Sequence, residues 1–110
     1  MIRVNASATV DVVEAAPNRI EVKGALTFST ARRAREAGLK IIKGSQSREP
    51  LEVDCAGVEE SDSAGLAVLI DWLSNAKVQG RTVQFSNLPT GIVAAARISD
   101  VDPMLGIPPA

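Results

Sequence analysis

Histidine and tyrosine are absent from this 110-residue sequence, and cysteine and tryptophan occur once each. Histidine is the usual general base of serine hydrolases and a common zinc ligand, so its absence excludes a Ser-His-Asp triad. The single cysteine, Cys55, can form neither an internal disulfide nor a multi-cysteine metal site, which fits a reducing compartment. We therefore expect no enzyme activity, no metal and no other cofactor.

Aromatic residues, unbalanced charge and long apolar runs are also scarce. Aromatics make up 3% of the chain, and twelve basic against thirteen acidic residues leave a net charge of -1. Such a chain has no platform for stacking bases and no field that attracts nucleic acid or an anionic membrane. The longest apolar run, residues 64–70, is about a third of the ~20 residues that span a bilayer, and no signal-peptide pattern opens the chain. We expect no nucleic-acid partner, no direct membrane insertion and a cytoplasmic location.

Hydrophobic periodicity divides the chain into strands and helices. Alternation of apolar and polar residues, which is typical of strands, occurs at residues 10–12, 20–22, 51–55 and 81–85. Apolar residues at helical spacing occur at residues 31–44, 63–79 and 89–98, and an irregular tail follows. Pro17-Asn18 marks the turn of an initial hairpin, and Pro89 opens the last helix. The order β-β-α-β-α-β-α predicts one α/β unit whose later strands pair in parallel.

The first two helices have predicted buried faces, and the first has a predicted cap. Ser29 or Thr30 stands where a side chain can accept hydrogen bonds from the first amides of the helix that begins at Ala31. The buried face of this helix consists of Ala34, Gly38, Ile41 and Ile42. The core face of the second helix consists of Leu66, Leu69, Ile70 and Leu73, and Gly80 ends the helix.

Asp62-Ser63-Ala64-Gly65-Leu66, between a strand and the second helix, is the sharpest local feature of the chain. Asp62 is the expected N-cap, which directs the Ser63 hydroxyl at the first helical position toward solvent or a partner. We interpret these five residues, with Glu59 and Glu60 before them, as a candidate partner-binding or switch segment. The alternative is structural: Ser63 is a second capping residue, and Gly65 allows the helix to pack closely on a strand.

Four side chains on the two helices are candidates for a protein interface: Arg32, Arg33, Arg35 and Trp72. The three arginines either meet an acidic patch on another protein or form a solvated helix face. Trp72 lies beside the predicted core face, where it either borders the core or anchors an interface. In the preceding strand we expect Cys55 to be a small buried hydrophobe. Asp54 is expected to accept backbone amides and so to hold the turn at residues 55–61.

The segment VDCAGVEESDSAGLAVLIDWLSNAKVQGRTVQFSNLP, residues 53–89, resembles the core of a STAS domain, the module of anti-sigma factor antagonists and sulphate-transporter tails. In that family a strand ending in Asp leads to D-[ST]-x-G-L at a helix start, and Asp54 and residues 62–66 occupy these places. The resemblance covers roughly residues 19–105 and implies a single STAS domain over residues 1–110. The implied SpoIIAA-like fold is a small mixed sheet with helices packed mainly on one face.

Three segments, GALTFSTA, SDVDPML and, within residues 53–89, DSAGLAVLIDWLSNAK, resemble the MlaB-like STAS subunits of Mla phospholipid-transport systems. This resemblance implies a non-catalytic subunit that binds the cytoplasmic ATPase of an ABC transporter and, through the ATPase, a permease at the inner membrane. Such systems maintain the lipid asymmetry of the outer membrane. The partner-binding residues implied are those of the segment around Ser63.

Two other functions remain open. In the anti-sigma factor antagonist branch of the family, the serine at the position of Ser63 is phosphorylated by a partner kinase. A phosphate there would stand beside Glu59, Glu60 and Asp62, so we expect it to disturb partner binding more than the fold. A small serine hydrolase is the least favoured function, because Lys40, Lys43 and Lys77 fall at solvent-type helix positions and leave Ser63 without a base.

Overall fold

A four-stranded sheet of order β1-β2-β3-β4 organises the chain. The computed structural model describes residues 8–109; the predicted domain span of 1–110 therefore includes residues 1–7 and 110, which lie outside the described part. The strands are β1 (Val10–Ala16), β2 (Arg19–Leu26), β3 (Leu51–Ser61) and β4 (Val83–Ser86). β1 and β2 form the predicted antiparallel hairpin, whereas β2–β3 and β3–β4 pair in parallel. The turn of the hairpin includes Asn18 at φ 65°, a left-handed conformation that asparagine adopts more readily than most residues.

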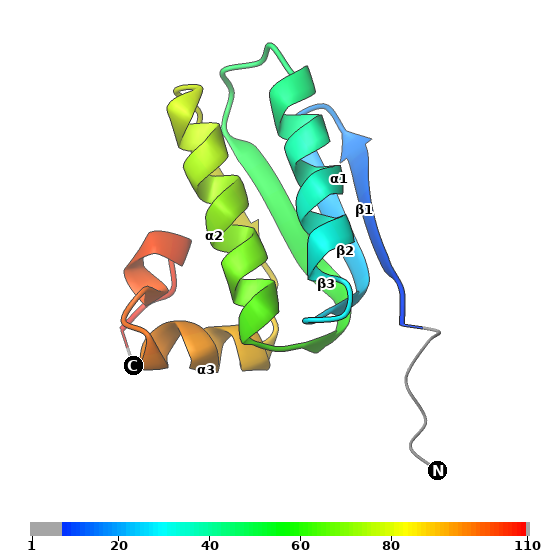
Figure 1. The fold of residues 1–110 in the computed structure, drawn as a ribbon. Helices are drawn as coiled ribbons and strands as arrows, with labels where there is room; N and C mark the ends of the chain where they lie inside the picture. Colours follow the sequence, from blue (N-terminus) through cyan, green and yellow to red (C-terminus); the bar gives the residue numbers. More distant parts are fainter. Residues whose placement is uncertain (1–7, 110) are drawn as a thin grey trace.

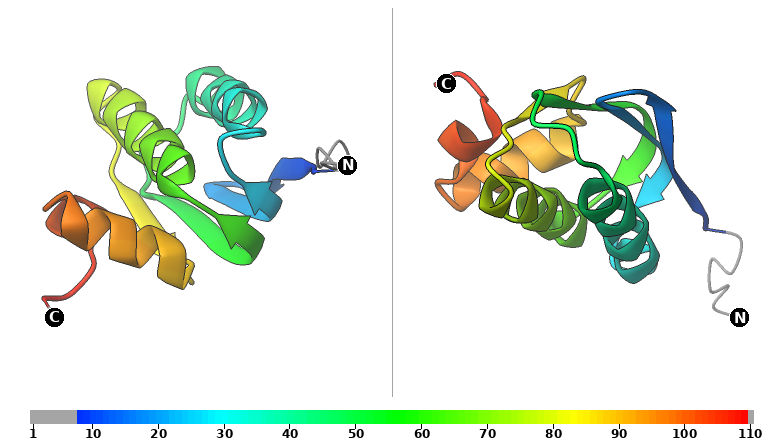
Figure 2. Two further views of the ribbon diagram at one scale, coloured as in Figure 1. Left: turned by 60° about the horizontal axis from the view of Figure 1, so that its bottom comes forward. Right: turned by 90° about the horizontal axis from the view of Figure 1, so that it is seen from above.

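The helices lie mainly on one face of this sheet, as expected. α1 (Ala31–Gly44) and α2 (Ser63–Val78) run side by side across it, and α3 (Thr90–Ile98) packs against α2 (Figures 1 and 2). Each parallel strand pair is joined through one of these helices, as a parallel connection requires. The observed order, β-β-α-β-α-β-α, is the predicted one. Within residues 8–109 no helix is both long and apolar enough to cross a bilayer.

Trp72 is the largest fully buried side chain and lies between the two main helices. Its exposed fraction is 0%, and its indole Nε1 donates a hydrogen bond to the carbonyl oxygen of Arg35 at 3.2 Å. The ring packs against α1 where Gly38 has no side chain, since a Cβ there would lie 2.1 Å from the ring. Trp72 is therefore a core residue, and the hypothesis that it anchors an interface is wrong for the folded chain.

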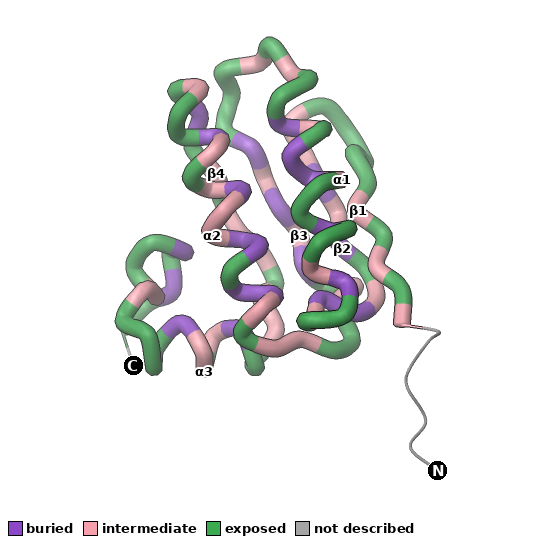
Figure 3. Tube along the Cα trace, viewed as in Figure 1, coloured by how far each residue is buried: buried purple, intermediate pink, exposed green. Residues whose placement is uncertain are grey.

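The predicted helix faces were partly wrong. On α1, Leu39 is buried beside the expected residues, whereas Ile41 is only half-buried. On α2, Val68 joins Trp72 in the core, whereas Ile70 and Leu73 are half-buried. The physical reason is that α2 packs against α1 on one side and against α3 on the other. These neighbours bury a different set of α2 residues from the set that periodicity alone favours. Figure 3 shows buried positions on the facing sides of α1 and α2.

β3 is longer than expected. The alternation at residues 51–55 predicted a short strand and a turn at 55–61, but β3 continues to Ser61. Its second half pairs in parallel with the end of β2, with Lys23 opposite Gly57 and Leu26 opposite Ser61. Two exposed acidic residues, Glu59 and Glu60, hid this strand because they interrupt the apolar alternation.

The chain after α3 contains one further short helix before it ends irregularly. Residues Asp102–Leu105 form a 3-10 helix, η1. Leu105 and Ile107 are 3% and 8% exposed and belong to the hydrophobic core. The sequence analysis missed η1 because two apolar residues with polar neighbours carry little periodicity, whereas residues 107–109 have no regular secondary structure, as expected of an irregular tail.

Arg81 is a buried residue that the sequence analysis did not identify. Its exposed fraction is 2%, although it lies in the loop before β4. Its guanidinium donates hydrogen bonds to the carbonyl oxygen of Glu49 and to Oδ1 of Asn18, each at 2.6 Å. Arg81 therefore ties together three loops at the end of the sheet opposite Ser63.

Candidate functional site

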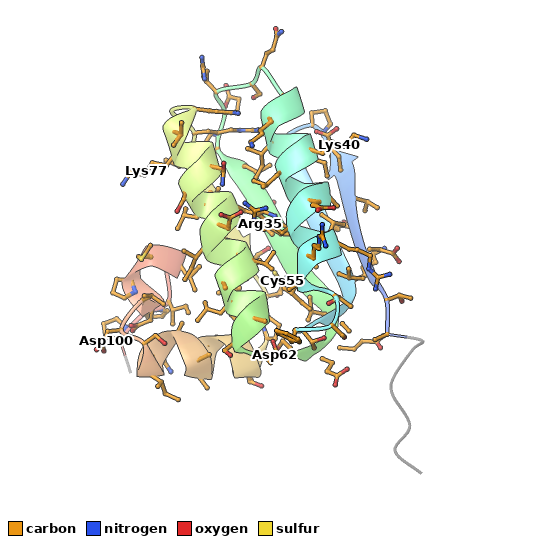
Figure 4. All side chains as sticks on the ribbon, in the orientation of Figure 1. Arg35, Lys40, Cys55, Asp62, Lys77 and Asp100 are labelled. Carbon is orange, nitrogen blue, oxygen red and sulfur yellow. The ribbon has the colours of Figure 1, made fainter. Side chains whose placement is uncertain are left out.

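Asp62 fixes the start of α2. Its Oδ1 accepts hydrogen bonds from the amides of Ala64, at 2.9 Å, and Gly65, at 3.2 Å, so the predicted N-cap is confirmed. Its other oxygen, Oδ2, accepts a hydrogen bond at 3.0 Å from the amide of Phe28, in the loop between β2 and α1. Figure 4 shows Asp62 at the foot of α2. One carboxylate thus joins the starts of both main helices.

The remaining residues of the motif divide into exposed and buried ones. Ser63 is exposed at the first position of α2, and Ala64 is half-buried. Gly65 is buried, and a Cβ on it would lie 2.3 Å from the carbonyl oxygen of Leu26. Leu66 is 5% exposed and lies in the core. Gly65 and Leu66 therefore position the helix start through packing, and the hypothesis that they contact a partner is wrong because both are buried. Ser63 and Ala64 reach the surface and remain candidates for partner contact.

The loop before α1 contains a functional candidate that the sequence analysis missed. Phe28 is 85% exposed. Thr30, two residues later, is fully buried; its hydroxyl donates to the carbonyl of Ala25 at 2.7 Å and accepts from the amide of Thr27 at 3.0 Å. Neither Ser29 nor Thr30 caps α1 as predicted: Thr30 is the N-cap residue, but its side chain makes no cap hydrogen bond because it closes this loop instead. The only sequence signal for Phe28 was a large apolar residue between polar neighbours.

A hollow of about 590 Å³ opens between the N-terminal halves of α1 and α2, next to Ser63. Its lining is mostly apolar and consists of Phe28, Ala31, Arg32, Arg35, Ala64, Ala67, Val68 and Asp71. Three alanines face it, and their small side chains leave the space open. The hollow therefore presents apolar surface to the solvent at the end of the molecule that the motif occupies.

The predicted basic cluster is divided by the fold. Arg35 extends from α1 toward α2, where its Nε lies 2.9 Å from Oδ2 of Asp71 in an ion pair without hydrogen-bond alignment (Figure 4). The side chain of Arg32 is 92% exposed at the rim of the hollow, 3.3 Å from Glu36. Arg33 does not line the hollow and donates instead to the carbonyl of Ala8. Two of the three arginines therefore belong to the site.

The charges around the site differ between its two sides. Glu59 and Glu60 are exposed at the end of β3, directly before the cap residue. The α1 side carries Arg32 and Arg35, each of which lies within ion-pair distance of a carboxylate, that of Glu36 and that of Asp71.

The three lysines considered as bases lie away from Ser63, and the Cys55 thiol is unreactive. Lys40, Lys43 and Lys77 are exposed, and Figure 4 shows Lys40 and Lys77 toward the opposite end of the helices from Asp62. Burial, and to a smaller extent the charge of Asp54, raises the pKa of the buried Cys55 thiol to about 12. A thiol with that pKa is protonated at neutral pH and is a poor nucleophile. Across residues 8–109, no group of three His, Cys, Asp or Glu side chains is placed to hold a metal ion.

Asp54 belongs to a separate polar network on β3. Its Oδ1 accepts hydrogen bonds at 2.9 Å from the amide of Ala56 and from the side chain of Asn87. Asp54 thus accepts a backbone amide, as predicted, but Ala56 belongs to β3 and not to the turn that was expected at residues 55–61. The Oδ2 of Asp54 lies 2.6 Å from the guanidinium of Arg19. The hydrogen bond from Asn87, then that from Ala56, then Arg19, lower the pKa of Asp54. This network holds neighbouring strands together and does not reach the hollow.

Comparisons with known proteins agree with this geometry. A family model described as "Mlab, STAS domain" matches residues 11–106. No curated protein sequence matches the chain. The unphosphorylated form of the anti-sigma factor antagonist SpoIIAA has a TM-score of 0.65 at 13% identity, with 86% of this chain and 84% of that chain covered. A sulfate transporter family protein from Wolinella succinogenes has a TM-score of 0.61 at 16% identity, covering 80% and 70%.

A larger protein, SLC26A9, contains the same fold. It gives a TM-score of 0.59 at 16% identity over 78% of this chain, which spans only 16% of that protein. These identities are low, so the structural likenesses establish the fold, and the family match over residues 11–106 establishes the family. With the D-S-A-G-L motif at the start of α2 and the SpoIIAA-like sheet, the chain belongs to the STAS domain family.

Proposed function

We propose that this STAS domain is a non-catalytic adaptor in the cytoplasm that binds the ATPase subunit of an Mla-type phospholipid ABC transporter. Through the ATPase it is held at the inner membrane beside the permease, and it regulates the assembly or turnover of the transporter. The resemblance of three segments to MlaB-like subunits supports this branch of the family. The ATP hydrolysis belongs to the partner.

The observation that carries the proposal is an apolar surface beside the family motif. Phe28 is 85% exposed, and it stands at the edge of the hollow that begins next to Ser63. Aromatic residues that fill a pocket on a partner dominate the binding energy of many protein interfaces. The ATPase is proposed to supply a pocket for Phe28 and an apolar side chain for the hollow.

Such docking regulates the ATPase through selective binding. An adaptor shifts its partner toward the conformation that it binds more tightly, by no more than the difference between the two affinities. A negative group on Ser63 faces the amide end of α2, which attracts it, and the carboxylates of Asp62 and Glu60, which repel it. Placed at the edge of an apolar contact, this charge weakens binding because the contact must then desolvate it.

The second candidate function is an anti-sigma factor antagonist that a partner kinase switches by phosphorylating Ser63. Two observations favour it: Ser63 is exposed, and the fold is that of SpoIIAA. Both functions use the same surface, so identification of the bound protein separates them.

The test is affinity capture with the tagged protein from its native cytoplasmic and membrane extract, followed by titration against the purified partner. Wild type is expected to retain an ABC transporter ATPase with its permease, and Phe28→Ala and Ser63→Asp to weaken ATPase binding at least about tenfold. Val78→Ala is the matched control, because Val78 is 88% exposed at the other end of α2. Capture of a sigma-regulating kinase, with phosphate on Ser63, would establish the second candidate instead. Equal ATPase binding by all four proteins would refute docking through this surface.

A further inference from the structure

We infer that Asp62 is a positioning residue for docking: its carboxylate holds Phe28 in the place where a partner meets it. The inference rests on the docking function proposed above and deepens it. It gives Asp62 a task other than contact with the partner, because the two carboxylate oxygens already hold three amides of this chain.

The hydrogen bonds of Asp62 divide between two elements that are distant in sequence. Oδ1 accepts from the first turn of α2, at Ala64 and Gly65. Oδ2 accepts from the amide of Phe28, which precedes Asp62 by 34 residues. An ordinary N-cap needs only the first of these interactions. The second oxygen therefore supplies a link from α2 to the loop before α1.

The placement of Phe28 depends on its backbone because its ring has little support. With 85% of the residue exposed, few contacts hold the ring against the protein. The buried Thr30 hydroxyl closes the loop on itself and on the end of β2, through Thr27 and Ala25. The hydrogen bond to Asp62 adds the connection to α2, which forms the other wall of the hollow.

The α2 side of this link is rigid. Gly65 lies so close to β2 that a Cβ on it would stand 2.3 Å from the carbonyl oxygen of Leu26. The helix start therefore has a fixed position on the sheet, and the hydrogen bond from the Phe28 amide to Asp62 fixes Phe28 relative to it. Loss of the Oδ2 hydrogen bond leaves the fold intact and allows Phe28 to sample other positions, each of which lowers the fraction of molecules ready to bind.

Substitution of one carboxylate oxygen separates the two tasks of Asp62. Asp62→Asn keeps one acceptor oxygen and replaces the other with a donor, so it can cap α2 but cannot at the same time accept from Phe28. Asp62→Ser also caps a helix well, and its single short hydroxyl does not reach both elements. Both variants are expected to keep the melting temperature within a few degrees of wild type.

The first measurement needs no partner. Amide hydrogen exchange by NMR is expected to show the Phe28 amide exchanging about tenfold faster in both variants, since a hydrogen bond to a charged group is lost. The amide of Val53, near the start of β3 and away from Asp62, is the control and is expected to keep its rate. An unchanged rate at Phe28 would refute the positioning role.

The second measurement is a double-mutant cycle on ATPase binding. Asp62→Asn is expected to weaken binding about tenfold in the wild-type background and by less than twofold in the Phe28→Ala background, because Asp62 acts through Phe28. An equal loss in both backgrounds would mean that Asp62 acts on the partner directly and would overturn the inference. If the wild-type chain binds no ATPase, the proposed function fails, and the exchange measurement still decides the role of Asp62.

Discussion

Substitution of Gly38 by alanine tests the packing of α1 on α2, which positions both walls of the hollow. Gly38 is buried in the middle of α1, and its missing side chain makes room for the ring of Trp72. Helix propensity alone predicts that alanine stabilises a helix interior by about 1 kcal/mol relative to glycine. The packing predicts the opposite sign, so the experiment separates the two effects.

The structure sets the size of the expected loss. The added Cβ would lie 2.1 Å from Trp72 Cε2, whereas carbon atoms in contact prefer about 3.5–4.0 Å. Trp72 has no exposed surface into which to retreat, so α1 must move away from α2. A contact this short places the cost in the upper part of the usual range for overpacking, at about 2–3 kcal/mol, and the gain in propensity offsets about 1 kcal/mol. We expect a net loss of about 1–2 kcal/mol, at roughly 4–8 °C of melting temperature for each kcal/mol.

The assay is urea unfolding followed by far-UV circular dichroism, with tryptophan fluorescence and near-UV circular dichroism to report on Trp72. Gly44→Ala is the matched control, because Gly44 ends the same helix, is exposed and has no atom within 4 Å of an added Cβ. It is expected to be neutral or slightly stabilising. If Gly38→Ala were as stable as wild type, with an unchanged near-UV spectrum, the close packing of Trp72 on α1 would be refuted.

Three further predictions concern residues outside the docking surface. Arg81→Met removes the donors to Glu49 and Asn18 and should lower the free energy of unfolding by about 1–3 kcal/mol in a urea titration. The folded-state pKa of Asp54 is lowered, so the stability it contributes is present above its ordinary pKa and is lost as the pH falls through the lowered value. Urea titrations at a series of pH values should accordingly show that the free energy of unfolding falls less steeply with decreasing pH in Asp54→Asn than in wild type. An equal fall in the two proteins would contradict this. The Cys55 thiol, with its pKa raised to about 12 by burial, should react with a chromogenic disulfide reagent at pH 8 only when the chain is unfolded.

The order of strands and helices and the cap at Asp62 followed from the sequence. Both depend on residues close together in the chain: strand alternation, helical spacing, and a carboxylate within reach of the amides two and three residues later. The D-S-A-G-L segment also placed Ser63 correctly on the surface at the first turn of α2. Local interactions of this kind are nearly the same in any fold that contains the segment.

Other features depend on neighbours that lie far away in the sequence. The second half of β3 is a strand because β2 pairs with it, although Glu59 and Glu60 make it look like a loop. Trp72 is buried because Gly38 of α1 leaves room for its ring, and no residue close to position 72 in the sequence indicates this contact.

The sequence by itself therefore determined the architecture and one part of the candidate site, Ser63 at the start of α2. The tertiary structure alone decided the rest: the hollow, the Arg35–Asp71 pair across it, and the exposed Phe28 at its edge. The physical reason is that the amide of Phe28 meets the carboxylate of Asp62 across 34 residues of chain. Only the parallel pairing of β2 with β3 brings the ends of those strands, and the loops that follow them, to the same edge of the sheet.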